Sequence, residues 1–237
     1  MANKRSKGEG AARQTIVRPL KGSVTKHRDR VAPAGARRAA RDIAGAVNRV
    51  RIIGGLWKRT PLPVLDTAGL RPTPDRVRET LFNWIEHFVP ALEAVRALDF
   101  FAGTGALGFE IASRGAQRVT LIENNRQLTD QLTQTKRKLA AEQVDIIAAD
   151  ALTTAARWPD ASFEVIFIDP PFDAALLAPA LATAARLITP DGLIYVESGA
   201  PIDESLLARY GLQIARVGRA GRVHFHLLRQ NLSHKPA

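Results

Sequence analysis

Cysteine is absent from this 237-residue sequence, which also contains only one methionine and two tyrosines. Without cysteine, the chain cannot form a disulfide scaffold, a zinc ribbon, an iron–sulfur site or a thiol nucleophile. Long apolar runs are also missing, since none approaches the roughly 18–20 residues of a membrane span. The basic start, MANKRSKGEGAARQ, lacks the apolar stretch of a secretory signal. We therefore expect a cytoplasmic protein with no membrane partner.

Acidic residues are scarce in the first fifth of the chain. Residues 1–51 hold 14 Lys and Arg against 3 Asp and Glu, whereas residues 52–237 hold 20 of each, so the whole net charge of +11 lies in the first segment. Such a segment suits phosphate groups, because each neutralised phosphate releases counterions. Nucleic-acid contact is therefore the favoured interpretation, ahead of a plain solvated tail and an organelle transit peptide.

Composition and pattern divide the chain into three parts. Residues 1–48 show no sustained periodicity and form a basic arm that we expect to be disordered. Residues 49–90 combine a strand, a short returning strand at residues 61–64 and an amphipathic helix that begins near Pro74, which predicts a small hairpin plus helix. Residues 91–237 form the main domain.

Short apolar runs alternate with helical stretches throughout the main domain. This alternation is typical of a mostly parallel α/β sheet with helices on both faces. The last two strands have no long helix between them, so we expect them to close one edge as an antiparallel pair. The expected strands are residues 97–102, 118–123, 144–149, 163–169, 192–198, 212–217 and 223–228.

A glycine-rich turn follows the first of these strands. Residues 99–108, DFFAGTGALG, match G-x-G-x-x-G. Glycines there let the backbone approach a ligand, and the helix that follows offers free N–H groups. Glu123 ends the next strand, where a carboxylate can accept both hydroxyls of a ribose. These features predict a nucleotide-type pocket that suits a dinucleotide or S-adenosylmethionine equally well, with a tight turn that binds nothing as the alternative.

Two aspartates bear on that choice. Asp99 stands just before the glycine turn, where a dinucleotide would place its negative pyrophosphate. S-adenosylmethionine has no phosphate and carries an ammonium group, so Asp99 favours this cofactor. Asp150 follows the third strand. It can hydrogen-bond an adenine amino group or cap the helix after it, and the two roles can coexist.

The sequence Asp169-Pro-Pro-Phe172 follows the buried strand at residues 163–168. Two prolines cannot continue a central strand, so they form a rigid turn. The carboxylate of Asp169 and the carbonyl of Pro170 make a pair of acceptors that suits an exocyclic NH2 group. Phe172 offers a face on which a base can stack. The alternative is a proline-rich turn with a capping aspartate and a core phenylalanine.

The two motifs, in this order, resemble the class I S-adenosylmethionine-dependent methyltransferases that modify exocyclic amines of bases. Three further segments, RIIGGLW, LRPTPDRVRETLFNWI and LIYVES, resemble the RsmD family of bacterial ribosomal RNA methyltransferases. The resemblance spans roughly residues 49–230. It implies a Rossmann-like sheet of seven strands, mostly parallel with an antiparallel edge strand, and methylation of N2 of a specific guanine in the 16S rRNA of the small ribosomal subunit.

The resemblance also implies roles for individual residues. The catalytic set that takes the guanine is Asp169, Pro170, Pro171 and Phe172. The set that binds S-adenosylmethionine is Thr73, Asp99, Ala102, Gly103, Thr104, Gly105, Gly108, Glu123, Asn124, Asp150 and Ala151. The set that contacts RNA is Trp57, Lys58, Arg59, Arg71, Arg76 and Arg78.

The implied chemistry needs no metal, because the sulfonium is already a good electrophile and the protein mainly positions the amine. His224 and His226 share one strand face but have no evident third ligand. We expect a monomer. The alternatives are N6 methylation of adenine in DNA or another RNA, a nicotinamide-dependent oxidoreductase, and a non-catalytic RNA-binding module.

Overall fold

The computed structural model describes residues 50–65, 73–171 and 174–231. All of them belong to one structural unit, residues 43–237. The basic arm expected over residues 1–48 lies outside the described residues, and so its expected disorder stays a prediction.

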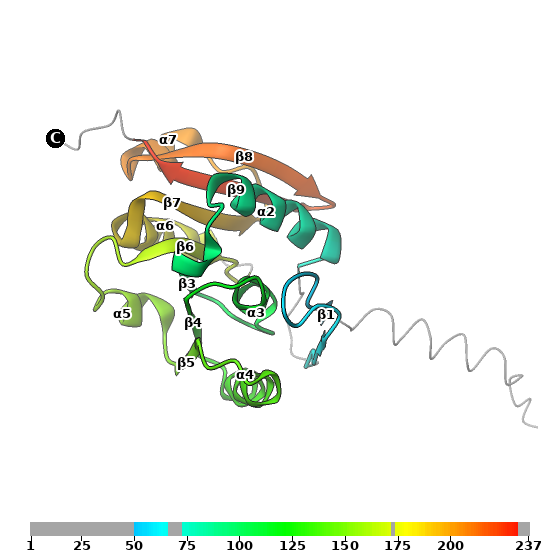
Figure 1. Cartoon of the computed structure of the whole chain (residues 1–237). Coiled ribbons are helices and arrows are strands. Elements are labelled where there is room, and N and C mark those ends of the chain that lie inside the picture. The colour runs from blue at the N-terminus through cyan, green and yellow to red at the C-terminus, as the bar shows by residue number, and fades with distance from the viewer. Residues whose placement is uncertain (1–49, 66–72, 172–173, 232–237) are drawn as a thin grey trace, which may run out of the picture. The chain divides into compact units, whose positions relative to one another are not determined.

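Seven strands form one mixed sheet in the order β5-β4-β3-β6-β7-β9-β8 (Figure 1). Strands β3 to β7 run parallel, and β9 is antiparallel to both of its neighbours, β7 and β8. The predicted sheet and its closing antiparallel pair are confirmed. The strands are β3 (Arg96–Asp99), β4 (Arg118–Glu123), β5 (Val144–Ala148), β6 (Phe163–Ile168), β7 (Ile188–Ser198), β8 (Leu212–Ala220) and β9 (Val223–Gln230).

Helices cover both faces of the sheet, as expected for strands that are apolar on both sides. Helices α2, α3 and α4 pack on one face and α5, α6 and α7 on the other, and each face has its own hydrophobic cluster (Figure 1). The helices are α2 (Asp75–Phe88), α3 (Ala106–Ser113), α4 (Arg126–Leu139), α5 (Ala151–Ala155), α6 (Ala174–Leu187) and α7 (Glu204–Arg209). The short α7 and a 3-10 turn at Leu92–Ala94 are not predicted from the sequence, because neither is long enough to show helical periodicity.

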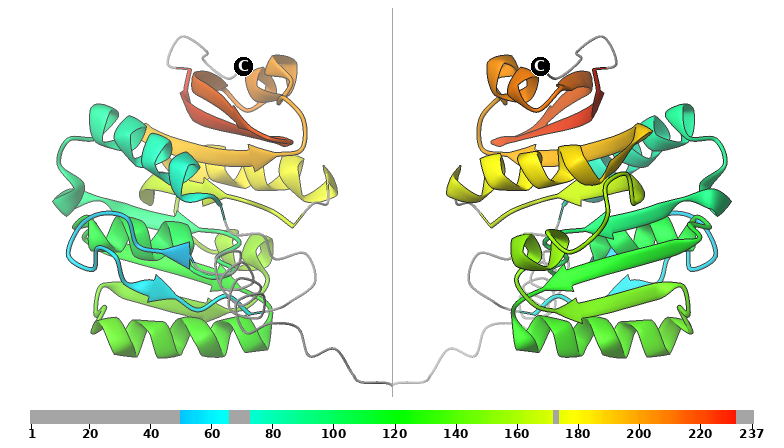
Figure 2. Two further views of the ribbon diagram at one scale, coloured as in Figure 1. Left: turned by 90° about the vertical axis from the view of Figure 1, so that its right-hand side faces the viewer. Right: turned by 90° about the vertical axis from the view of Figure 1, so that its left-hand side faces the viewer.

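The chain before the sheet forms the expected hairpin. Strand β1 (Val50–Arg51) pairs antiparallel with β2 (Pro61–Leu62). Its apolar side chains join the same buried cluster as α2, α3 and the sheet. Figure 2 shows the hairpin and α2 in front of the sheet in the left view, and α5 and α6 in front of it in the right view. The hairpin, α2 and the sheet therefore share one buried cluster. The boundary expected at residue 90 separates these segments along the chain but not in the core.

The strand order determines where a ligand can bind. From β3 the chain proceeds outward through β4 and β5, and then returns to place β6 on the other side of β3. In such open α/β sheets the crevice at the reversal point, outside the carboxyl ends of the strands, is the usual ligand site. Among the described residues, no helix has both the length and the hydropathy needed to cross a bilayer.

Candidate active site

A cavity of about 1430 Å³ lies at the carboxyl ends of β3, β4, β5 and β6. Most of the sequence-predicted site residues line it, although they come from segments far apart in the chain. Gly105 and Gly108 are absent from the lining and instead shape the turn beside it. The predicted residues in the lining are Thr73, Asp99, Ala102, Gly103, Thr104, Glu123, Asn124, Asp150, Ala151, Asp169, Pro170 and Pro171.

The glycine turn after β3 needs its glycines for different reasons. Gly105 has a φ of 78°, and a Cβ there would lie 2.5 Å from the Phe109 ring. A Cβ on Gly108 would lie 2.0 Å from Leu121 on β4, so this glycine lets α3 pack closely on the sheet. The turn therefore brings the backbone N–H groups at the start of α3 to the cavity wall without side chains in between.

Asp99 presents an acceptor without a partner. Its side chain is buried, and within the described part of the chain no donor reaches Oδ1. Burial raises the pKa of Asp99 to about 7, the backbone N–H of Phe101 opposes this rise, and the nearby Glu123 adds to it. A cationic ligand group in the cavity would satisfy Oδ1 and favour the ionised carboxylate.

Glu123 and Asp150 already have backbone partners. Glu123 accepts from the backbone N–H of Gly103 through Oε2 at 2.9 Å and from that of Asn125 through Oε1 at 2.8 Å. Asp150 caps α5 by accepting from the backbone N–H of Thr153 at 2.8 Å, a bond that lowers the pKa of Asp150. Each carboxylate has about four acceptor positions, so both can take further donors from a ligand in the cavity.

A cluster of acids surrounds the Asp169-Pro-Pro turn. The pairing of Ile168 with Val196 puts Asp169 and Glu197 one step further along neighbouring parallel strands. Burial raises the pKa of Asp169 well above its usual range, and the charge of Glu197 is the next largest cause. Sequence reasoning missed Glu197. The only signal was its place at the end of the apolar run LIYVES, the strand that becomes β7.

Glu197 itself is held by two hydroxyl groups. Thr73 Oγ1 donates to Glu197 Oε1 at 2.7 Å, and the Tyr195 hydroxyl donates to the same oxygen at 2.9 Å. Burial raises the pKa of Glu197, and these two bonds oppose the rise. Thr73, predicted to contact the cofactor, therefore also fixes this carboxylate in the cavity wall.

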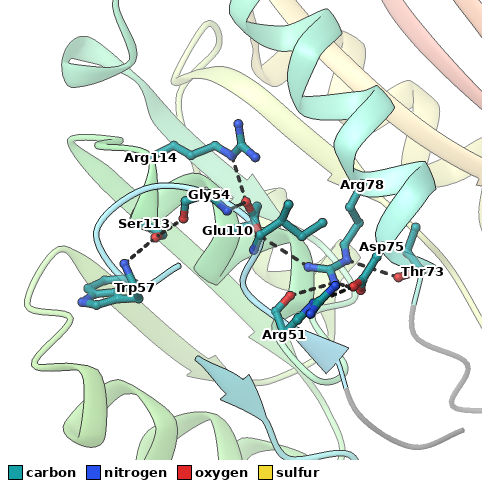
Figure 3. Close-up of polar contacts among 10 residues, drawn as sticks. Arg51, Gly54, Trp57, Thr73, Asp75, Arg78, Glu110, Ser113 and Arg114 are labelled. Carbon is teal, nitrogen blue, oxygen red and sulfur yellow. Dashed lines mark hydrogen bonds and ion pairs between the residues drawn. The ribbon is translucent and has the colours of Figure 1, made fainter. Parts of the chain in front are cut away.

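Arg78 lies in the protein interior and not on an RNA-facing surface. The sequence analysis expects it to touch RNA, but its side chain is completely buried, so the structure contradicts this role. The guanidinium donates to the carbonyl oxygens of Arg51 at 2.8 Å and Thr73 at 3.2 Å, and to Asp75 Oδ1 at 2.7 Å (Figure 3). Its Nη1 also lies 3.4 Å from Oε2 of the buried Glu110 on α3. Burial lowers the pKa of Arg78, and the charges of Glu110 and Asp75 oppose this fall.

Glu110 completes a buried polar network. It accepts from the backbone N–H groups of Ile53 at 2.7 Å and Gly54 at 2.8 Å, and from Arg114 Nε at 2.9 Å (Figure 3). The Arg78–Glu110 pair therefore joins the hairpin loop, α2 and α3, and it anchors the backbone at Thr73 beside the cavity. The sequence reasoning gave no role to Glu110.

The other basic candidates do not line the cavity. Residues 57–59 lie in the hairpin loop, where the backbone N–H of Trp57 donates to Ser113 Oγ at the last residue of α3. The cavity lies at the first residue of this helix, Ala106, and eight helical residues span about 12 Å. Lys58 and Arg59 are exposed and Trp57 is half-buried.

Arg76 is exposed in the first turn of α2, two residues after Pro74, which lines the cavity. Arg71 and Phe172 lie outside the described residues, so their expected contacts with RNA and with the base stay predictions. Of the predicted RNA contacts that the structure describes, Arg76 thus has the position closest along the chain to the cavity wall.

Comparison with known proteins shows the family of this chain. Residues 50–229 match the family model described as Conserved hypothetical protein 95. The chain is 42% identical over 160 residues to Ribosomal RNA small subunit methyltransferase D of Haemophilus influenzae, which covers 65% of this chain and 80% of that protein.

Solved structures also resemble this chain. The chain is similar to the Escherichia coli protein yhhF, with 36% identity, a TM-score of 0.65, and coverage of 77% of this chain and 98% of that one. A precorrin-6y C5,15-methyltransferase from Geobacter metallireducens, at 16% identity and a TM-score of 0.55, covers 70% of this chain and 92% of its own, and shows that the fold is shared more widely. With the family model matching about three quarters of its length, the chain belongs to the RsmD family of ribosomal RNA small subunit methyltransferases.

Proposed function

We propose that this protein methylates the exocyclic N2 amine of a specific guanine in 16S rRNA of the small ribosomal subunit, with S-adenosylmethionine as the cofactor. The observation that carries the proposal is that one cavity contains both the buried Asp99, whose Oδ1 has no partner within the described residues, and the Asp169-Pro-Pro turn. We also propose that the enzyme acts as a monomer in the cytoplasm.

The cofactor half of the cavity fits S-adenosylmethionine. Asp99 Oδ1 has no partner within the described residues and would accept from its ammonium group, and Gly103 in the adjacent cavity wall would contact its methionine part. Glu123 would accept from the ribose hydroxyls and Asp150 from the adenine amine. When bound, the cofactor supplies a methyl group on a positive sulfur.

Cofactor binding should weaken at low pH because of Asp99. Its pKa of about 7 in the free protein means that it is protonated below pH 7, and only its ionised form attracts the ammonium group. We expect the Kd for S-adenosylmethionine to be about tenfold higher at pH 5.5 than at pH 7, a range in which an α-amino group stays protonated. Isothermal titration calorimetry measures this.

The Asp99→Asn variant is the control for this effect. It should bind the cofactor weakly at both pH values and lose most of the pH dependence. A wild-type Kd that stays constant from pH 5.5 to 7 would remove Asp99 from the ammonium site.

The base half of the cavity holds the amine for attack. The Asp169 carboxylate and the Pro170 carbonyl accept the two N2–H groups, so that the nitrogen lone pair points at the methyl group. As the new N–C bond forms and the S–C bond breaks, positive charge develops on N2 and the acceptors stabilise it. N2 then loses one proton to Asp169, whose raised pKa suits this role, or to water.

The edge of the cavity supports a nucleic-acid substrate. Strand β9 pairs antiparallel with β7, with His224 opposite Ser198, so the β8–β9 turn projects at the same edge as the cavity. Arg222 in this turn is exposed and lines the cavity, and Arg219 beside it is also exposed. No acidic residue follows Glu204 in the sequence, so the β8–β9 turn itself carries only positive charge, which suits a phosphate contact.

A transfer assay tests the proposed function. The protein is incubated with tritiated S-adenosylmethionine and either small ribosomal subunits from a strain that lacks the enzyme or unmethylated duplex DNA, and the labelled nucleoside is identified. N2-methylguanosine from the subunits is expected. N6-methyladenine from the DNA would instead support the adenine alternative, because the Asp169-Pro-Pro turn can hold either amine.

A further inference from the structure

Glu197 stands beside the residue that holds the target amine. It is the second-last residue of β7, at the register position next to Asp169, which follows β6, and both residues line the cavity. Glu197 is 7% exposed, so its carboxylate belongs to the cavity wall and not to the outer surface. The pKa of Asp169 is raised by the charge of Glu197, which agrees with close placement of the two carboxylates.

The contacts of Glu197 leave one oxygen for a ligand. Thr73 and Tyr195 both donate to Oε1, at 2.7 and 2.9 Å, and no contact to Oε2 occurs within the described residues. Because Glu197 lines the cavity, this second oxygen is the one available to a ligand there. Burial raises the pKa of Glu197, and the two hydroxyl donors oppose this rise because they favour the ionised carboxylate. The cavity thus contains two adjacent acidic acceptors where the base must enter.

This pair complements the edge of guanine. Guanine has an N1–H donor directly next to its N2 amine, so two neighbouring carboxylates can each accept from one of these groups. Adenine has an N1 acceptor next to its N6 amine, and an ionised carboxylate facing that atom would repel it. Moreover, the three N–H donors of guanine offset the repulsion between two ionised carboxylates, whereas adenine offers only two.

We propose that Glu197 is the residue that selects guanine, by accepting a hydrogen bond from N1–H while Asp169 and Pro170 hold the N2 amine. This inference rests on the proposed function and adds a specificity residue to it. Glu197 contributes to discrimination because a base without N1–H leaves a buried carboxylate without its donor.

The test replaces the target guanine by 2-aminopurine, which keeps the N2 amine but has an acceptor at N1. Subunits are reconstituted with 16S rRNA that carries either base, and kcat/KM for methyl transfer is measured on both. We expect the wild-type protein to prefer guanine by roughly 100-fold or more. For Glu197→Gln we expect the preference to fall below about tenfold, because an amide can both donate to N1 and accept from N1–H.

Two controls separate selection from structural support. Tyr195→Phe removes one hydrogen bond to Glu197 but keeps the carboxylate, so its preference for guanine should stay near the wild-type value. The Kd of Glu197→Gln for S-adenosylmethionine should stay within about twofold of wild type, which shows that the variant folds and binds.

The possible results are distinct. A wild-type enzyme that uses both bases equally, or a Glu197→Gln variant that loses activity on both by the same factor, would overturn the role of Glu197 while leaving the proposed function intact. If wild-type protein with bound cofactor transfers no methyl group to the guanine-containing subunits, the proposed function fails, and the inference fails with it.

Discussion

Asp169→Asn should lower kcat for methyl transfer by about 10³-fold or more and leave the Kd for S-adenosylmethionine nearly unchanged. In the proposed mechanism the carboxylate accepts the target amine and stabilises the charge that develops on it, whereas the residues proposed to hold the cofactor follow β3, β4 and β5 in the cavity wall. An amide keeps the size of the side chain but loses the negative charge. Asp169→Ala should likewise abolish transfer. Single-turnover transfer and calorimetric binding of the cofactor measure the two effects separately.

Asp191→Asn is a suitable control for this experiment. Asp191 is exposed and lies on β7, toward the opposite end of the strand from the cavity. Its replacement removes the same charge from the protein and should leave transfer unchanged. Loss of cofactor affinity in Asp169→Asn, with transfer preserved at saturating cofactor, would assign Asp169 to the cofactor and not to the base.

Arg78→Met should destabilise the protein by about 3–5 kcal/mol, because it removes one of the two cations that pair with the buried Glu110 carboxylate and leaves only Arg114. It also removes the donors to the carbonyl oxygens of Arg51 and Thr73. For a domain of this size we expect Tm to fall by about 10 °C or more. Thermal unfolding followed by circular dichroism, together with urea unfolding, measures the change.

Arg118→Met is the matched control, because Arg118 also pairs with a carboxylate, at 2.6 Å from Asp145, but its side chain is 67% exposed. A pair at the surface contributes little, so we expect a loss below about 1 kcal/mol. If both variants lose the same small amount, the buried network does not stabilise the fold. If Arg78→Met keeps its stability and loses only RNA binding, Arg78 contacts RNA as the sequence analysis expected.

The Arg78 network also explains why the hairpin belongs to the active site. Glu110 accepts from the backbone of the hairpin loop, and Arg78 holds the carbonyl of Thr73, whose hydroxyl in turn donates to Glu197. A chain of hydrogen bonds therefore runs from the hairpin to the acid pair at the base site. The RPT-x-DRVRE stretch supplies the two middle links of this chain, Thr73 and Arg78.

The sequence by itself determined the fold class, the glycine turn after β3 and the Asp169-Pro-Pro turn after β6. These features depend on local patterns: apolar strands alternate with helices, glycines allow a close turn, and prolines end a strand. Parallel strands align their carboxyl ends at one edge, which is why the turns at Asp99 and Asp169 share one cavity in the structure.

Only the tertiary structure decided the roles of Glu197 and Arg78. Glu197 faces the base site because the register between β6 and β7 places it next to Asp169, and register depends on the packing of segments that lie far apart in the chain. Arg78 looks like a surface cation in a helix rich in charged residues, but the fold buries it and supplies Glu110 from α3 to balance its charge. Sequence patterns carry the local backbone geometry, whereas the pairing of distant charged groups arises only when the core closes around them.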